Sequence, residues 1–341
     1  TNTWTMYDLL KPYVHSVTVV HPPHVHLITR AQVMTDKKAA LVLAQLHAAG
    51  LLPPVWVPPK EVRDLRAIIS QRRKMVNLST QAKNRLQSLL HRHNIVPPSR
   101  KEMYSPEGRS WWESLPLSAL EHFRIQTDLD TLSFAQKQVK RLDACLAAQS
   151  TKDERVPLLV QLPGVALLSA MTILAAIGDI DRFEEPKQLV GYAGLGARVH
   201  DSGESRKTGR ITKSGRKDLR HAMVQVAHLA KRKHPHWKAE FKRLSRRIGK
   251  QKAKVAVARK LLVAVWHVLT KGEADRHSTD TQIACAFFAH AYRVGVRNLP
   301  DGLSATAYTR RQLDRLGIGK ELTTIPWGSK RPKLPPSTLM A

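Results

Sequence analysis

The sequence is poor in cysteine and in acidic residues. Its 341 residues include two cysteines, Cys145 and Cys285, which are too few for a disulfide framework or a cysteine-based zinc site. We therefore expect a reducing compartment, the cytoplasm. The chain opens on TNTWTMYDLL, without a signal peptide or an initiating methionine, so we expect its N-terminus to be a cut within a longer sequence.

The shortage of acid leaves a large positive charge. Asp and Glu number 27 against 56 Lys and Arg, which gives a net charge of +29. A polyanion usually neutralises such self-repulsion, and nucleic acid is the first candidate, ahead of an anionic membrane surface. Residues 198–260 hold 21 Lys and Arg against four Asp and Glu. This segment is therefore expected to face the polyanion.

One long stretch, VPLLVQLPGVALLSAMTILAAIG at 156–178, lacks charge altogether. It is long enough to span a membrane, but Pro163 and Gly164 interrupt a helix at its middle. We therefore interpret it as a helix-hairpin-helix without a membrane role. Free N–H groups of residues 164–167, with Gly164 at the turn, would hold a DNA phosphate without reading sequence. A buried helical hairpin without a ligand is the alternative.

Apolar spacing predicts a mainly helical fold. SVTVVHPP at 16–23 is typical of a short buried strand and residues 30–49 of a helix, so the N-terminal part is expected to be α/β. Longer helices are predicted from Val62 to about Arg92 and around Leu129 to Leu146, where apolar residues recur three, four or seven apart. These two helices would pair as an antiparallel coiled-coil hairpin. An ordinary helical bundle fits the spacing equally well.

A polar segment, HDSGESRKTGRITKSGRKDLR at 200–220, gathers glycine, serine and cations. Ordering such a loop costs much backbone entropy, so we expect an outside partner to order it. Among its serines, Ser214 best suits the cap of a helix that begins near Arg216. Its cations are candidates for DNA phosphate contacts: Arg206, Lys207, Arg210, Lys213, Arg216, Lys217 and Arg220.

Four segments together carry a resemblance to a known family. They are VTVVHPPHVHLITRAQVMTDKKAALVLAQLHAAGLLP, LPGVALLSAMTILAAIGDIDRF, LVGYAGLGARVHDSGESRKTGRITKSGRKDLRHAMVQVA and KVAVARKLLVAVWHVL. In order and spacing they resemble the Piv-type DEDD transposases, the insertion-sequence family that includes the bridge-RNA-guided recombinases. The resemblance covers most of residues 1–270.

The resemblance implies a fold and a chemistry. Family members join an N-terminal RuvC-like domain of the RNase H type to a helical transposase domain, and they cleave and rejoin DNA. Four carboxylates of the first domain hold Mg²⁺, and a serine of the second attacks the phosphodiester. In the family motif H-x-S-G that serine precedes the glycine, and here the stretch is His200-Asp201-Ser202-Gly203. The resemblance therefore implies that Ser202 is catalytic, with a guide RNA and a homo-oligomer as partners.

The chain departs from the family at the carboxylates. The family's last two acids lie three residues apart, as T-D-x-x-D, and here the stretch is Thr35-Asp36-Lys37-Lys38-Ala39. Asp36 is the one metal-binding acid of the four that this sequence retains, so the resemblance implies an impaired, truncated copy. Three hypotheses follow: a DNA recombinase, a non-catalytic nucleic-acid-binding remnant, or a structural RNA-binding protein.

Four regions are expected along the chain. They are a truncated RuvC-like domain at 1–58, a helical coiled-coil region at 59–155, a helical transposase domain with the helix-hairpin-helix and the serine loop at 156–272, and a C-terminal extension at 273–341.

Overall fold

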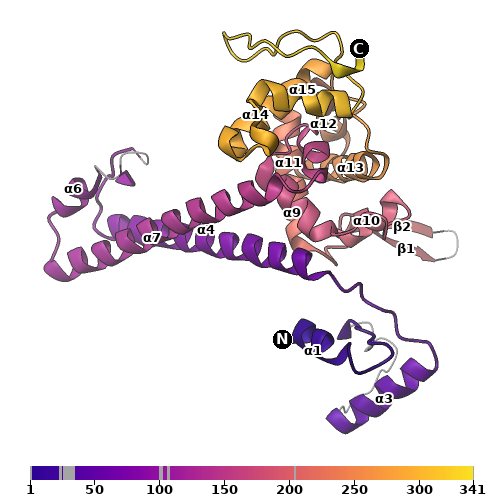
Figure 1. The fold of residues 1–341 in the computed structure, drawn as a ribbon. Helices are drawn as coiled ribbons and strands as arrows, with labels where there is room; N and C mark the ends of the chain where they lie inside the picture. Colours follow the sequence, from indigo (N-terminus) through magenta and orange to yellow (C-terminus); the bar gives the residue numbers. More distant parts are fainter. Residues whose placement is uncertain are drawn as a thin grey trace. The chain divides into compact units, whose positions relative to one another are not determined.

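The computed structural model describes residues 2–22, 25, 35–99, 103–105, 108–202 and 205–340. They belong to two compact units, Thr1–Glu61 and Val62–Ala341, each of which is described by itself (Figure 1). The chain is mainly helical, as the apolar spacing predicts. Within the described residues, the only sheet has two strands, β1 and β2.

The first unit contains α1 (Thr3–Leu10) and α3 (Asp36–Ala48) in its described part. The hydroxyl of Thr35 begins α3 by accepting a hydrogen bond from the Lys38 N–H, at 3.4 Å. The strand expected at 16–23 is wrong for residues 16–22, where a single bridge joins Val20 to Pro54. A strand needs a neighbour along its whole length to satisfy its backbone groups. The described residues of this unit offer one such contact, so a RuvC-like sheet stays a prediction.

The second unit begins with two long helices, α4 (Lys60–Arg92) and α7 (Ala119–Ser150). Arg72 pairs with Asp143 at 2.5 Å, and Arg85, further along α4, pairs with Asp128, further back on α7, at 2.6 Å. Partner numbers fall as residue numbers rise, so the two helices run antiparallel, and Figure 1 shows them side by side. Ser118 caps α7 by accepting from the Glu121 N–H.

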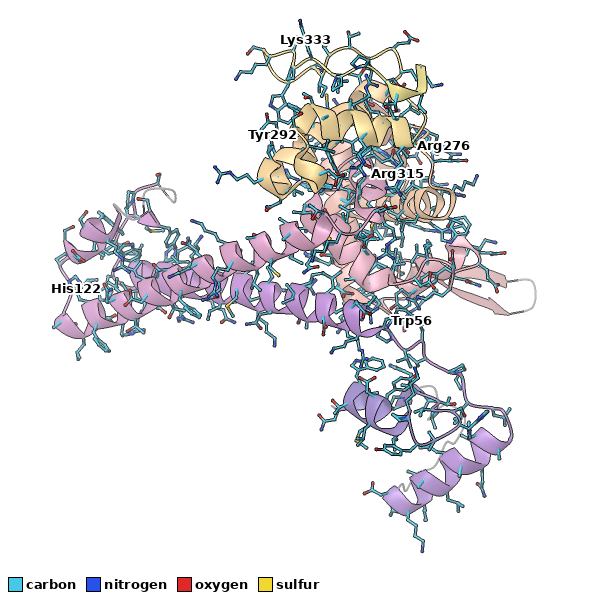
Figure 2. All side chains as sticks on the ribbon, in the orientation of Figure 1. Trp56, His122, Arg276, Tyr292, Arg315 and Lys333 are labelled. Carbon is cyan, nitrogen blue, oxygen red and sulfur yellow. The ribbon has the colours of Figure 1, made fainter. Side chains whose placement is uncertain are left out.

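A small core closes the far end of this helical pair, where α6 (Gly108–Glu113) packs on it. Trp112 is fully buried there, and its Nε1 donates to the Met103 carbonyl oxygen at 2.9 Å. Figure 2 labels His122 at this end, where its ring nitrogen lies 3.0 Å from the Leu115 carbonyl oxygen. Apolar residues of both long helices complete the core: Leu86, Leu89, Leu90, Ile125 and Leu129.

The main core lies among the remaining helices of the second unit. Nine of the eleven residues of α9 (Leu167–Ile177) are buried, so the uncharged stretch at 156–178 forms the centre of a globular core. No helix in the described part of the chain is long and apolar enough to cross a bilayer. The same core includes residues of α8 (Arg155–Val160), α10 (Pro186–Tyr192), α11 (Lys217–Lys233), α12 (Pro235–Ile248), α13 (Lys250–Lys271), α14 (Asp280–Val294) and α15 (Ala305–Arg315). Short 3₁₀ turns lie at Val296–Asn298, Pro300–Gly302 and Thr338–Met340.

Three arginines from different parts of the chain satisfy the C-terminal end of α9. Arg66 of α4 donates to the carbonyl oxygens of residues 175 and 176, at 2.7 and 3.0 Å. Arg182 donates to that of residue 177 at 3.0 Å, and Arg155 to that of residue 178 at 2.6 Å. These carbonyls have no partner within the helix and form the negative end of its dipole. The start of α4 is thereby tied to the main core.

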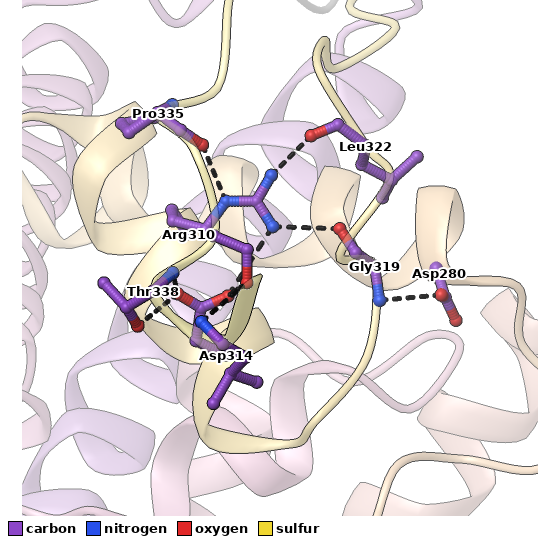
Figure 3. A network of polar contacts seen from close by, with 9 residues as sticks. Asp280, Arg310, Asp314, Gly319, Leu322, Pro335 and Thr338 are labelled. Atoms are coloured by element: carbon purple, nitrogen blue, oxygen red, sulfur yellow. Dashed lines mark hydrogen bonds and ion pairs between the residues drawn. The ribbon is translucent and has the colours of Figure 1, made fainter. Parts of the chain in front are cut away.

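A buried arginine orders the C-terminal segment, residues 316–340 (Figure 3). Arg310 of α15 has a side chain only 4% exposed. Its guanidinium donates to the carbonyl oxygens of Gly319 at 2.9 Å, of Pro335 at 2.8 Å and of Leu322. A buried cation requires such partners because desolvation is costly. The segment therefore wraps around Arg310.

Asp314, one turn after Arg310, completes this network. Its carboxylate accepts from the Ser337 hydroxyl at 2.7 Å and from the N–H and hydroxyl of Thr338 at 3.1 and 3.0 Å. Burial by itself would raise the pKa of Asp314, but these hydrogen bonds and Arg310 outweigh it and lower the pKa. Both ends of the segment are thus held by charge.

Candidate nucleic-acid interface

Residues 197–211 form a β-hairpin, where the sequence predicts an irregular loop. Strand β1 (Ala197–Ser202) pairs antiparallel with β2 (Ser205–Ile211), and Ser202 stands opposite Ser205 beside the tip. The same register sets Asp201 opposite Arg206 and His200 opposite Lys207. The β-branched residues of the two strands favour this pairing. The segment is also rich in glycine and serine, which is typical of a loop, and the sequence prediction followed that composition. Gly203 lies outside the described residues.

Two glycines allow the base of the hairpin to pack closely against the residues at the end of α10. The N–H of Lys213 donates to the Gly194 carbonyl oxygen at 3.2 Å, and the N–H of Arg216 donates to that of Tyr192 at 2.8 Å. Gly194 and Gly215 have φ angles of +65° and +103°, which strain other residues. A Cβ on Gly194 would collide with the Ser214 carbonyl oxygen, and one on Gly215 with that of Tyr192. Sequence reasoning missed Gly194, although the run Gly-Tyr-Ala-Gly-Leu-Gly at 191–196 was its signal.

The cations beyond the hairpin tip divide into two groups. Arg210, Lys213 and Lys217 are exposed, and Lys213 has a φ of +55°. Arg216 is paired with Asp218 at 2.5 Å, and Arg220 donates to the carbonyl oxygen of residue 193 at 3.0 Å. The exposed three can reach a phosphate without breaking a contact. Arg206 and Lys207 lie on β2. Phosphate contacts by these two residues stay a prediction.

Ser214 does not cap the helix that follows. Helix α11 begins at Lys217, and its N-cap residue is Arg216, which makes no side-chain cap. The Asp218 carboxylate accepts the Leu219 N–H at 2.9 Å instead. Because the turn at Gly215 separates Ser214 from the helix, the cap prediction for Ser214 is wrong.

A second group of cations gathers where α11, α12 and α13 pack together. Lys231 lies over the Phe241 ring, with Nζ 3.9 Å from the ring centre. Its partial burial lowers the pKa of the ammonium, and repulsion from Lys254, Arg232 and Lys250 lowers it further. Like charges held this close create a positive potential, which a phosphate would relieve.

Glu240 is the only acidic residue between 231 and 260, and it is already neutralised. Arg243 donates to it at 2.9 Å and Lys260 at 2.5 Å. These hydrogen bonds hold its pKa at about 2, well below the usual value of a glutamate. The surface of α11, α12 and α13 therefore keeps a positive excess.

The turn between α8 and α9 uses part of its N–H groups within the protein. The Val165 N–H donates to the Leu162 carbonyl oxygen, and the Ala166 N–H to the Ser169 hydroxyl, both at 3.0 Å. The expectation of free N–H groups is therefore wrong for these two residues. Gly164, with a φ of +84°, lies against α11, where a Cβ would come within 2.6 Å of a backbone oxygen. This packing explains the glycine, and a phosphate contact at Gly164 stays a prediction.

Asp36, the predicted metal ligand, is exposed at the first position of α3, next to Lys37 and Lys38. Within the described residues, no group of three or more His, Cys, Asp or Glu side chains is arranged to hold a metal ion. Mg²⁺ takes an octahedral set of oxygen ligands. A single carboxylate beside two ammonium groups does not fit that ion.

Two family models match the chain. The model of the Transposase IS116/IS110/IS902 family matches residues 156–242, which include the hairpin and α11. A second transposase model, of the DEDD type named for IS110, matches residues 2–95. Together they cover more than half of the sequence.

The similar proteins are named as transposases or as gene-inverting proteins. The Putative transposase y4qE of Sinorhizobium fredii (strain NBRC 101917 / NGR234) is 27% identical over 222 residues, 65% of this chain and 54% of that protein. The Pilin gene-inverting protein of Moraxella bovis is 29% identical over 264 residues, 75% of this chain and 73% of that protein. The Transposase for insertion sequence element IS1111A of Coxiella burnetii (strain RSA 493 / Nine Mile phase I) is 25% identical over 271 residues, 76% and 72% of the two chains. This chain thus spans about half of the first relative and nearly three quarters of the other two.

Proposed function

Since this chain belongs to the IS116/IS110/IS902 family of transposases, we propose that it acts on DNA as an insertion-sequence recombinase that cleaves and rejoins strands. The observation that carries the proposal is the positive surface of the second unit. Exposed Arg210, Lys213 and Lys217 lie near the base of the hairpin, and the cations of α11, α12 and α13 surround one neutralised acid. Such a surface suits a phosphate backbone and reads no sequence.

Ser202 is the proposed nucleophile. It is the last residue of β1 and stands opposite Ser205, the first residue of β2. In the proposed step the Ser202 oxygen gives up its proton and bonds to phosphorus, while the bond from phosphorus to one DNA oxygen breaks and that oxygen takes up a proton. In the reverse step a DNA hydroxyl loses its proton and attacks the phosphoserine, the bond between phosphorus and the serine oxygen breaks, and the serine regains its proton. Arg206, Lys207 and Arg210 follow on the paired strand, and their charges would stabilise the phosphate in the transition state.

Metal chemistry is not assigned to this chain's own residues. Family members of the DEDD type suggest dependence on a divalent metal, but Asp36 alone does not fit Mg²⁺. We therefore propose that the remaining carboxylates come from outside the described residues, and that a homo-oligomer brings Ser202 of one copy to the carboxylates of another. A guide RNA would share the positive surface. The non-catalytic remnant would have the same affinity for DNA without covalent chemistry.

The salt dependence of DNA binding tests the proposal. Replacing Arg210, Lys213 and Lys217 together by alanine removes three phosphate contacts, so the slope of log affinity against log salt should flatten by about 2.7, at about 0.9 per contact. The matched control replaces Lys320, Lys330 and Lys333, three exposed lysines of the C-terminal segment, and removes the same charge.

An unchanged slope in the first variant would place the DNA elsewhere on the protein. Equal flattening in both variants would mean that net charge alone attracts DNA, with no defined surface.

A further inference from the structure

A pocket of 540 Å³ lies beside the turn between α8 and α9. The turn forms one wall with residues 160–167, and the C-terminal end of α11 forms another with Leu229 and Lys233. The opposite wall is one face of α14, whose residues 281, 285, 289 and 293 recur every four positions. This volume lies within the range of small-molecule sites. We call it the α14 pocket.

The charges around the α14 pocket are all of one sign. Lys233 and Arg293 line it and are exposed, and no Asp or Glu is among its lining residues. More than half of its lining residues are apolar, including the buried Leu162, Val165 and Leu167. An anionic group is therefore favoured at the rim and an uncharged, largely apolar group inside.

His290 is one of the buried polar side chains that line the pocket, together with His234 and Gln161. His290 is 5% exposed, and its Nδ1 has no hydrogen-bond partner among the described residues. Burial, with a smaller effect from the nearby Arg293, lowers the pKa of His290 to about 4. The ring is thus neutral at pH 7 and offers one donor and one acceptor. A buried group of this kind ordinarily has a partner, and a neutral ring suits an uncharged heterocycle better than a phosphate.

We infer that the α14 pocket takes one unpaired nucleotide of the nucleic-acid partner, with its base against His290 and Ala289 and its phosphate at Lys233 and Arg293. A base stacked within a duplex cannot enter such a pocket, so the nucleotide comes from a single strand or leaves the helix. The inference rests on the proposed function, because it adds a base-binding site to a backbone-binding surface.

Single strands with one abasic position test the inference. The position is moved along a short oligonucleotide, in separate DNA and RNA series, and affinity for the full-length chain is measured at each step. One position should weaken binding about tenfold, which lies within the range that a stacked base typically contributes. Ala289→Phe, which fills the pocket from a half-buried helical site, should give the same loss with the intact strand and none with that abasic strand.

The matched control is Ala148→Phe, the same change at an exposed site on α7, and it should bind both strands like the parent protein. Thermal melting establishes that Ala289→Phe folds; Ala286→Phe, on the same wall of the pocket, replaces it otherwise. Equal weakening of both strands by Ala289→Phe, or no sensitive abasic position in either series, would overturn the inference while leaving the backbone-binding surface intact. Absence of all nucleic-acid binding would instead refute the proposed function itself.

Discussion

Replacing Arg310 by methionine should release the C-terminal segment. The guanidinium of Arg310 donates to three carbonyl oxygens of that segment and lies 3.6 Å from the Asp314 carboxylate. Methionine fills similar space without any donor, so the three carbonyls and the carboxylate lose their charged partner. The change therefore isolates what the buried cation contributes.

The magnitude follows from burial. Hydrogen bonds from a charged donor contribute about 1.5–3 kcal/mol each. The sum over the three bonds is an upper limit for the loss of stability, because water hydrogen-bonds to the carbonyl oxygens once the segment opens. Removing one partner of a buried ion pair costs about 3–5 kcal/mol, and Asp314 keeps its hydrogen bonds from Ser337 and Thr338. We expect a loss of about 3–5 kcal/mol. The buried side chains of Ile325 and Leu334 stabilise the closed segment by about the same amount. Without Arg310 the segment therefore loses about half of its stabilisation, and we expect the segment to open before the main core unfolds.

Native-state hydrogen exchange measures this opening. The amide of Ile325 donates to the residue 332 carbonyl oxygen, and that of Leu334 to the residue 323 carbonyl oxygen. In Arg310→Met their protection should fall about a hundredfold or more, as 1.4 kcal/mol is a factor of ten. Arg311→Met is the matched control, because its ion pair with Asp301 is more than half exposed on both sides and contributes less than about 1 kcal/mol. Equal protection in the two variants would refute the reasoning.

Three other predictions concern His290, Asp36 and Ser202. The folded-state pKa of His290, about 4, lies below its value of 6.5 in the unfolded chain, so stability present above pH 6.5 is lost as pH falls. The free energy of unfolding should fall by about 2 kcal/mol by pH 5. Urea denaturation at pH 7 and pH 5 should show a smaller fall in His290→Gln than in the parent protein, and equal falls would contradict this prediction. Ala39→Asp adds a carboxylate one turn from Asp36, so calorimetry should show tighter Mn²⁺ binding, and unchanged affinity would reject the proposed correspondence. In a fusion that supplies a relative's acidic N-terminal segment, Ser202→Ala should abolish covalent protein–DNA adducts and keep DNA affinity, whereas Ser214→Ala should keep both; adducts in Ser202→Ala would exclude that nucleophile.

Elements whose signal is local could be predicted from the sequence. The leucines of α4 and α7 recur at helical spacing, and burial of one face follows from that period alone. The strand expected at 16–23 failed because a strand depends on a partner far away in sequence. Likewise, Val199, Thr208 and Ile211 favour a hairpin only once β1 and β2 are aligned.

The candidate site divides in the same way. A positive segment at 198–260 is visible in composition, so the general location of the interface could be predicted. Which cations stay exposed could not, because Arg216 and Arg220 have partners that only the fold provides. Nothing in the local sequence marks His290 or Arg310 as buried, because their burial results from segments distant in sequence.

The paired glycines at the base of the hairpin limit how family members can exchange parts. Gly194 and Gly215 each face the backbone of the other's segment, so the two arms, residues 191–196 and 213–216, fit only as a matched set. A chimera that takes the hairpin and only one of these arms from a relative would pair that arm with an arm from a different protein. The close backbone contacts at the two glycines would then not be matched. Grafts bounded outside both arms should fold, and the transplantable module is therefore the block from 191 to 216, with its serine and its cations inherited together.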